Sequence, residues 1–159
     1  MALLATPPAL ADGRSDWRGY DWRSTEFGSC TDIDPAAGCH AHHAKWDWKR
    51  NQWVDVFYRG LDQSSLSVGL RLTNNDRKDD DYVCVTVLFL DANGRNLAAY
   101  HANIHIDPSS TESDETTMRL RPELIARIAK VDVGSKQCRE GAGQDADVFA
   151  RVRAALPQS

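Results

Sequence analysis

The stretch Tyr82-Val-Cys-Val-Thr-Val-Leu-Phe-Leu90 decides the fold class of this chain of 159 residues. Its odd-numbered positions are all apolar, and they are Val83, Val85, Val87 and Phe89. Because side chains alternate between the two faces of a strand, this pattern predicts a central strand with one fully buried face. Asp91-Ala-Asn-Gly94 follows as a hairpin turn with an Asn-Gly pair that accepts positive φ, so a return strand is predicted over residues 96–106.

A period of two recurs on both sides of this hairpin. It predicts strands over residues 53–58, 66–72, 116–120 and 129–133, with one helical turn over 122–128. Short strands, polar turns and little helix predict an all-β fold, an antiparallel immunoglobulin-like β-sandwich over residues 53–138. The residues expected to form its core share the apolar faces of these strands, and they are Leu66, Val68, Leu70, Leu72, Val83, Val85, Val87, Phe89, Val131 and Val133.

The segments that flank the sandwich lack this period. Residues 12–52 contain four of the five tryptophans and read as an irregular Trp-rich lead-in, with a loop between Cys30 and Cys39. Residues 139–159 form a tail in which a short C-terminal helix is predicted. The apolar face of that helix consists of Val148, Phe149, Val152 and Leu156.

The start of the chain suggests export. Residues 1–11 are small and apolar and end in Ala9-Leu10-Ala11, which is similar to the tail of a secretory signal peptide, although an ordinary N-terminus remains the alternative. No apolar run approaches the roughly 20 residues of a membrane helix, so no transmembrane segment is expected in the mature chain. Together these two features predict a periplasmic or secreted protein.

The charge of the chain argues against nucleic acid as a partner, because the formal net charge is −4 and the sequence has no basic stripe.

Four cysteines form an even set, which in an exported chain predicts disulfide bonds. Three pairings are possible, and a bridge from Cys30 to Cys39 is favoured because the short loop between them contains Asp34-Pro35 and Gly38. Cys84 then pairs with Cys138. Strand alternation places both of these cysteines on the outer face of a sheet, where a bridge between neighbouring strands is sterically reasonable.

Two stretches resemble the bacterial FxLYD-type immunoglobulin-like domains. They are Leu66-Ser-Val-Gly-Leu-Arg-Leu-Thr-Asn-Asn75 and Val85-Thr-Val-Leu-Phe-Leu-Asp-Ala-Asn-Gly94, and the similarity covers roughly residues 64–107. The family motif Phe-x-Leu-Tyr-Asp is replaced here by Val87-Leu-Phe-Leu-Asp91, which keeps the hydrophobicity, the Asp and the later Gly. The resemblance implies an exported immunoglobulin-like sandwich, usually without enzymatic activity.

One histidine cluster offers metal chemistry. Cys39-His-Ala-His-His43 places three imidazoles within four residues, so His40, His42 and His43 could bind zinc or copper. If this segment is extended, His40 and His42 share a face. A solvated loop beside a structural disulfide is the alternative, because no fourth ligand or standard zinc spacing is present. His101 and His105 alternate with apolar residues and are expected on a solvent-facing side, outside any site.

Three tryptophans offer a second kind of site. Exposed indoles stack on sugar rings and anchor protein interfaces, so Trp46, Trp48 and Trp53 could bind a ligand. Trp46 and Trp48 share a face if their segment is extended. Structural anchoring of the lead-in is the alternative.

No familiar catalytic spacing occurs in the sequence. There is no Gly-x-Ser-x-Gly elbow, His-Glu-x-x-His helix, P-loop or dinucleotide fingerprint, and the acidic runs lack the spacing of a calcium loop. We therefore predict a non-catalytic exported binding or protein-interaction module without a cofactor, whose partner is a protein or glycan of the cell envelope. A carbohydrate-binding sandwich and a Zn or Cu site are the alternatives.

Overall fold

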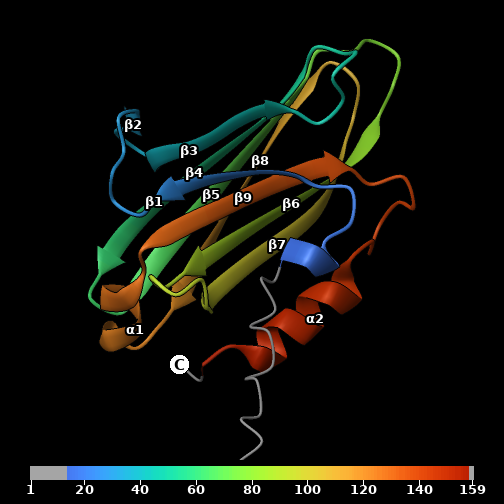
Figure 1. Ribbon diagram of the computed structural model, residues 1–159. Coiled ribbons are helices and arrows are strands. Elements are labelled where there is room, and N and C mark those ends of the chain that lie inside the picture. Colours follow the sequence, from blue (N-terminus) through green and yellow to red (C-terminus); the bar gives the residue numbers. More distant parts are fainter. Residues whose placement is uncertain (1–13, 158–159) are drawn as a thin grey trace, which may run out of the picture.

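A computed structural model describes residues 14–157 and shows two packed antiparallel sheets (Figure 1). The expected signal-peptide remnant at residues 1–11 lies outside the described residues. The strands are β1 (Asp21–Glu26), β2 (Ile33–Asp34), β3 (Gly38–Lys45), β4 (Gln52–Asp62), β5 (Ser65–Asn74), β6 (Asp81–Leu90), β7 (Asn96–Ile106), β8 (Ser110–Arg119) and β9 (Lys130–Gln137). The helices are the 3-10 turn η1 (Arg14–Asp16), α1 (Pro122–Arg127) and α2 (Ala146–Ala155).

The strand order confirms the predicted all-β sandwich. One sheet has the order β1-β9-β6-β7 and the other β2-β3-β4-β5-β8. Strands β4 to β9 cross between the sheets in the Greek-key order of an immunoglobulin-like domain, with β5 beside β8 and β6 beside β9. The position next to β9, which the last strand occupies in such domains, is taken here by the first strand, β1.

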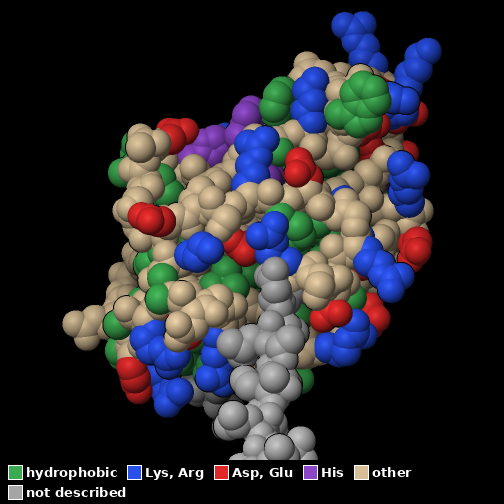
Figure 2. All heavy atoms as spheres, viewed as in Figure 1, with side chains coloured by type: hydrophobic (Ala, Val, Ile, Leu, Met, Phe, Trp, Pro, Cys, Tyr) green, Lys and Arg blue, Asp and Glu red, His purple; other side chains and the backbone are tan. Residues whose placement is uncertain are grey.

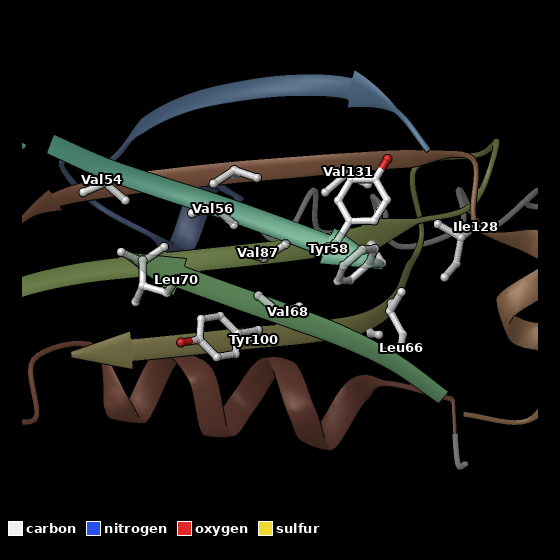
Figure 3. Close-up of a cluster of buried hydrophobic side chains, with 14 of the residues drawn as sticks. Val54, Val56, Tyr58, Leu66, Val68, Leu70, Val87, Tyr100, Ile128 and Val131 are labelled. Atoms are coloured by element: carbon white, nitrogen blue, oxygen red, sulfur yellow. The ribbon is translucent and has the colours of Figure 1, made fainter. Parts of the chain in front are cut away.

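The core lies between the two sheets, where side chains of β4 and β5 meet those of β6, β7 and β9 (Figure 3). All ten residues predicted for the core are buried. Tyr58 and Tyr100 add aromatic bulk, and the hydroxyl of Tyr100 donates a hydrogen bond to Asp114 at 2.8 Å. Burial raises the pKa of Tyr100 above its ordinary value, so this tyrosine stays a neutral donor.

The Trp-rich lead-in is not irregular, which corrects the prediction for residues 12–52. It contributes β1 to one sheet and β2 and β3 to the other, so the sandwich begins at Asp21 rather than at residue 53. The period of two is absent from this part of the sequence for two physical reasons. β1 is an edge strand with mostly exposed side chains, and β3 contains a β-bulge that interrupts the alternation.

The predicted C-terminal helix is present as α2 and packs on the outer face of the β1-β9-β6-β7 sheet, beside β7 (Figure 1). Val148 and Val152 are buried there against Trp17, in a second apolar cluster separate from the core. His101, expected to face solvent, lies under this layer instead, with its ring centroid 5.2 Å from that of Trp17 and 5.6 Å from that of Phe149. A docked helix and a tryptophan from the lead-in therefore cover what would otherwise be an exposed strand face.

Both predicted disulfides are confirmed: Cys30 pairs with Cys39, and Cys84 pairs with Cys138, with Cα atoms 5.7 Å and 5.6 Å apart. Cys84 lies on the outer face of β6, since its neighbours Val83 and Val85 point into the core.

Between residues 14 and 157, no helix is both long and apolar enough to span a bilayer.

A candidate metal centre on the outer face of β3 and β4

The β-bulge in β3 decides which histidines come together. Its register against β4 shifts between His40 and His42, so that His40 lies opposite Phe57 while His43 lies opposite Asp55. The extra residue reverses the alternation, and His40 and His43 therefore share the outer face of the sheet. His42 points inward, which corrects the expectation that His40 and His42 share a face.

The two outward histidines converge on one carboxylate. Nε2 of His40 and Nδ1 of His43 each lie 2.7 Å from the same oxygen, Oδ1 of Asp55. The three donor atoms lie within 4.8 Å of one another, close enough to hold one metal ion. Asp55 is buried, His40 is partly buried and the side chain of His43 is half exposed, so the group opens to solvent on the His43 side.

A second carboxylate stands behind His40. Oδ2 of Asp32 lies 2.7 Å from Nδ1, so both ring nitrogens of His40 face carboxylates. Burial lowers the pKa of His40, but the hydrogen bonds to Asp32 and Asp55 outweigh it and raise the pKa above its ordinary value. A metal ion at Nε2 would take the place of the proton there, while Nδ1–H would remain donated to Asp32, the outer partner that ligating histidines usually have.

Aromatic rings hold both imidazoles in place. The ring of His43 stacks on Trp53 with centroids 4.2 Å apart and an angle of 6° between the planes. His40 stacks on Phe57 with centroids 4.6 Å apart and an angle of 17°. Because alternate residues of β4 share a face, Trp53, Asp55 and Phe57 present two ring supports and a carboxylate side by side.

The donor set suits a first-row transition ion. Two imidazole nitrogens and one carboxylate oxygen are ligands that zinc accepts, at about 2.0–2.2 Å from the ion. A tetrahedral ion at these bond lengths keeps its ligand atoms about 3.3 Å apart. The two 2.7 Å contacts from the histidine nitrogens to Oδ1 of Asp55 would therefore have to lengthen by less than about 1 Å. Three protein ligands leave a fourth position free for a water molecule or another ligand.

His42 is not part of this group. Its Nε2 lies 3.3 Å from the hydroxyl of Ser135, and its Nδ1 is buried without a hydrogen-bond partner among the described residues. Burial, and then the charge of Arg23, lower the pKa of His42 to about 4, so the ring is neutral near pH 7. It packs as an uncharged, buried side chain between β3 and β9 of the opposite sheet.

The three candidate tryptophans lie in three different environments. Trp46 is buried and its indole donates a hydrogen bond to Asp81 at 3.2 Å, so it is an anchor of the core and not a surface ligand site. The chain turns after Trp46, and Trp48 is therefore 78% exposed in the β3-β4 connection and not on a face shared with Trp46. Trp53 is the partner of His43, and the ammonium of Lys45 lies 5.3 Å from its ring centroid.

Histidine side chains gather over β3 on the face drawn in Figure 2. They border a shallow depression of about 630 Å³ that Asp32, Asp55, Arg23 and Arg71 also line. Sequence reasoning found His40 and His43 but missed both carboxylates. A signal for Asp55 is present in Trp53-Val-Asp-Val-Phe57, where the polar residue stands at the centre of a strand.

Comparisons with known proteins add little to this picture. No protein-family model and no curated protein sequence matches the chain. Among solved structures, the chain is similar to the enzymatically active domain of bacteriophage CBA120 tailspike protein 4, at 10% identity and a TM-score of 0.30, over 73% of this chain and 17% of that one. A variant of oxalate decarboxylase from B. subtilis matches at 10% identity and a TM-score of 0.13, over 84% of this chain and 39% of that one. At these scores neither likeness informs the function.

Proposed function

We propose that this domain is an exported binding module that holds a divalent transition metal ion, Zn²⁺ or Cu²⁺, through His40, His43 and Asp55. The observation that carries the proposal is the convergence of three donor atoms within 4.8 Å of one another. Imidazole suits both ions, and copper generally binds a given donor set more tightly than zinc, so metal supply rather than affinity selects between them. The expectation that the module is non-catalytic stays a prediction.

The loop closed by the first disulfide supports this assignment. Cys39 immediately precedes His40, and Asp32 lies within the loop that the Cys30–Cys39 bond closes. The backbone N–H of His40 also donates to the carbonyl of Asp32 at 2.8 Å. The covalent link therefore fixes the outer carboxylate against its histidine before any ion binds, which reduces the conformational entropy that binding must overcome.

Two further features support export. Disulfides persist in oxidising compartments, and all four cysteines of this chain are paired. The apolar start that ends in Ala9-Leu10-Ala11 resembles a cleavage region. An exported module with a surface metal site would encounter its ion in the envelope or outside the cell.

Calorimetric titration of chelator-treated protein with Zn²⁺ and Cu²⁺ tests the metal site. We expect one ion per chain, with at least a tenfold loss of affinity in His43→Ala and in Asp55→Asn. The matched control is His105→Ala, because His105 is an exposed imidazole 2.7 Å from Asp80, outside the cluster. Melting curves without metal establish that each variant folds. Binding that is absent, or equally strong in the two ligand variants, would overturn the proposal.

Trp48 supports a second candidate function, a contact site for a protein or glycan. Its 78% exposure is unusual for so large an apolar side chain, which marks it as a candidate anchor. The connection that carries it is held by Arg50, which forms ion pairs with Asp47 and Asp79. A glycan panel and a pull-down from the native envelope, each with Trp48→Ala, test this function. Leu61→Ala, which removes another exposed apolar side chain, is the control.

A further inference from the structure

We infer that the free coordination position of this metal site takes an oxyanion, the carboxylate or phosphate group of a ligand. The inference deepens the proposed function and rests on it, since the metal ion supplies one of the contacts. Its basis is the pair of arginines, Arg23 and Arg71, that line the same depression as the three metal ligands. They come from different sheets: Arg71 of β5 lies directly opposite Asp55 of β4, and Arg23 of β1 is hydrogen-bonded to the carbonyl of His43 in β3.

Arg71 stands on one side of the cluster. Its guanidinium carbon lies 5.3 Å from the ring centroid of Phe57, and its Nε lies 3.9 Å from Oδ2 of Asp55, the oxygen that the histidines leave free. The side chain is about half exposed. The cation lies over the phenyl ring, and most of its N–H groups have no close carboxylate partner among the described residues, so these groups can donate to an oxyanion.

Arg23 stands on the other side. Its Nη1 donates a hydrogen bond of 3.1 Å to the backbone carbonyl of His43, which ties the guanidinium to the strand that carries the metal ligands. One such bond uses a single donor of the five that a guanidinium offers. The remaining donors are available to a ligand in the depression.

Charge favours an anion at this position. With the metal bound and the histidines neutral, the dication, Arg23 and Arg71 together outweigh the carboxylates of Asp55 and Asp32 by two positive charges. The Asp32 carboxylate is turned toward Nδ1 of His40. An oxyanion can coordinate the ion through one oxygen and accept hydrogen bonds from the arginines through its other oxygens, whereas water or a halide offers only a single atom for all of these contacts.

Cobalt substitution gives a direct readout of the free position, since Co²⁺ reports changes of its ligands through visible absorption. Co²⁺-loaded protein is titrated separately with acetate, as a carboxylate probe, and methylphosphonate, as a phosphate probe. We expect a saturable spectral change with at least one probe, and the probe that binds more tightly identifies the group. Arg71→Gln and Arg23→Gln should each weaken this binding by up to about fivefold, the upper end of the range for an exposed charged contact.

Matched controls separate this inference from the metal site. Arg59→Gln removes an arginine of β4 that pairs with Glu115 outside the depression and should leave probe binding unchanged. Neither Arg23 nor Arg71 is a metal ligand, so their variants should bind Co²⁺ at least as tightly as the parent protein. If Co²⁺ binds but neither probe alters the spectrum, or the arginine variants respond like the parent, the oxyanion inference is wrong while the metal site stands. If Co²⁺ does not bind, the proposed function itself has failed.

Discussion

Asp32 and His40 form a carboxylate–imidazole pair, with Oδ2 and Nδ1 2.7 Å apart, on the side of the ring away from Asp55. The pair fixes which nitrogen of His40 is free to bind an ion. Asp32→Asn keeps the size of the side chain but removes its charge, so we expect metal affinity to fall by about tenfold, as it does when outer partners of ligating histidines are replaced. Calorimetry measures this loss. Asp80→Asn, which alters the comparable Asp80–His105 pair, should leave metal affinity unchanged.

The two disulfides should stabilise the fold unequally. The Cys84–Cys138 bond closes a separation of 54 residues and the Cys30–Cys39 bond one of 9. By loop-closure entropy, loss of the longer bridge lowers the free energy of unfolding by about 4 kcal/mol and loss of the shorter by about 3 kcal/mol. Urea titrations of the two paired Cys→Ala variants measure both values. A larger loss from the shorter bridge would contradict the entropic account.

Position 134 in β9 requires glycine, because the indole ring of Trp22 in β1 packs directly over it. A Cβ atom at position 134 would stand 2.8 Å from two atoms of the indole. Gly134→Ala should therefore lower the free energy of unfolding by about 1–3 kcal/mol, the usual range for overpacking. Gly60→Ala is the control, since a Cβ there meets nothing within 4 Å. Combining Gly134→Ala with Trp22→Ala should relieve the clash, and additive losses in that double variant would argue against it.

His101 should make the domain less stable in mild acid. Burial lowers the pKa of His101 in the folded protein below its ordinary value of 6.5. The unfolded chain therefore takes up the proton first, and stability that is complete above about pH 6.5 declines as the pH falls toward the folded pKa. Denaturant titrations at pH 7.5 and 5.5 measure the difference, which should shrink in His101→Gln.

His105 should change the pH dependence of stability in the direction opposite to His101. Its hydrogen bond to Asp80 raises the pKa of His105, so its contribution is present below about pH 6.5 and declines as the pH rises through the folded pKa. His105→Gln should therefore lower stability at pH 5.5 more than at pH 7.5. If His101→Gln and His105→Gln shift the pH dependence in the same direction, one of the two assignments of sign is wrong.

The sequence predicted the sandwich because its central strands obey a strict period of two. The alternating apolar residues of Val83 to Phe89 and of Leu66 to Leu72 all face the core between the two sheets, and that constraint is visible in the residues themselves. The edge strand β1 carries no such constraint, since most of its side chains meet solvent. Its place beside β9 depends on pairing with residues at the far end of the chain, which local patterns do not encode.

The candidate site was only partly predictable for a related reason. The histidines stood out because three of them lie within four residues, but which of them share a face depends on the bulge between His40 and His42. Nothing in Cys39-His-Ala-His-His43 marks the residue that is left unpaired. Asp55 joins them only through the pairing of β3 with β4, and Asp32 only through the disulfide-closed loop.

The pairing of β1 with β9 at the edge of the β1-β9-β6-β7 sheet has a consequence for folding. β1 is synthesised before its partner β9, which is the last of the strands described between residues 14 and 157. Closing so long a loop is slow, because its entropy is lost before the new contacts repay it. Until then β1, with its one aromatic residue Trp22, has no partner strand, and an unpaired strand of this kind is prone to pair with other segments or other chains.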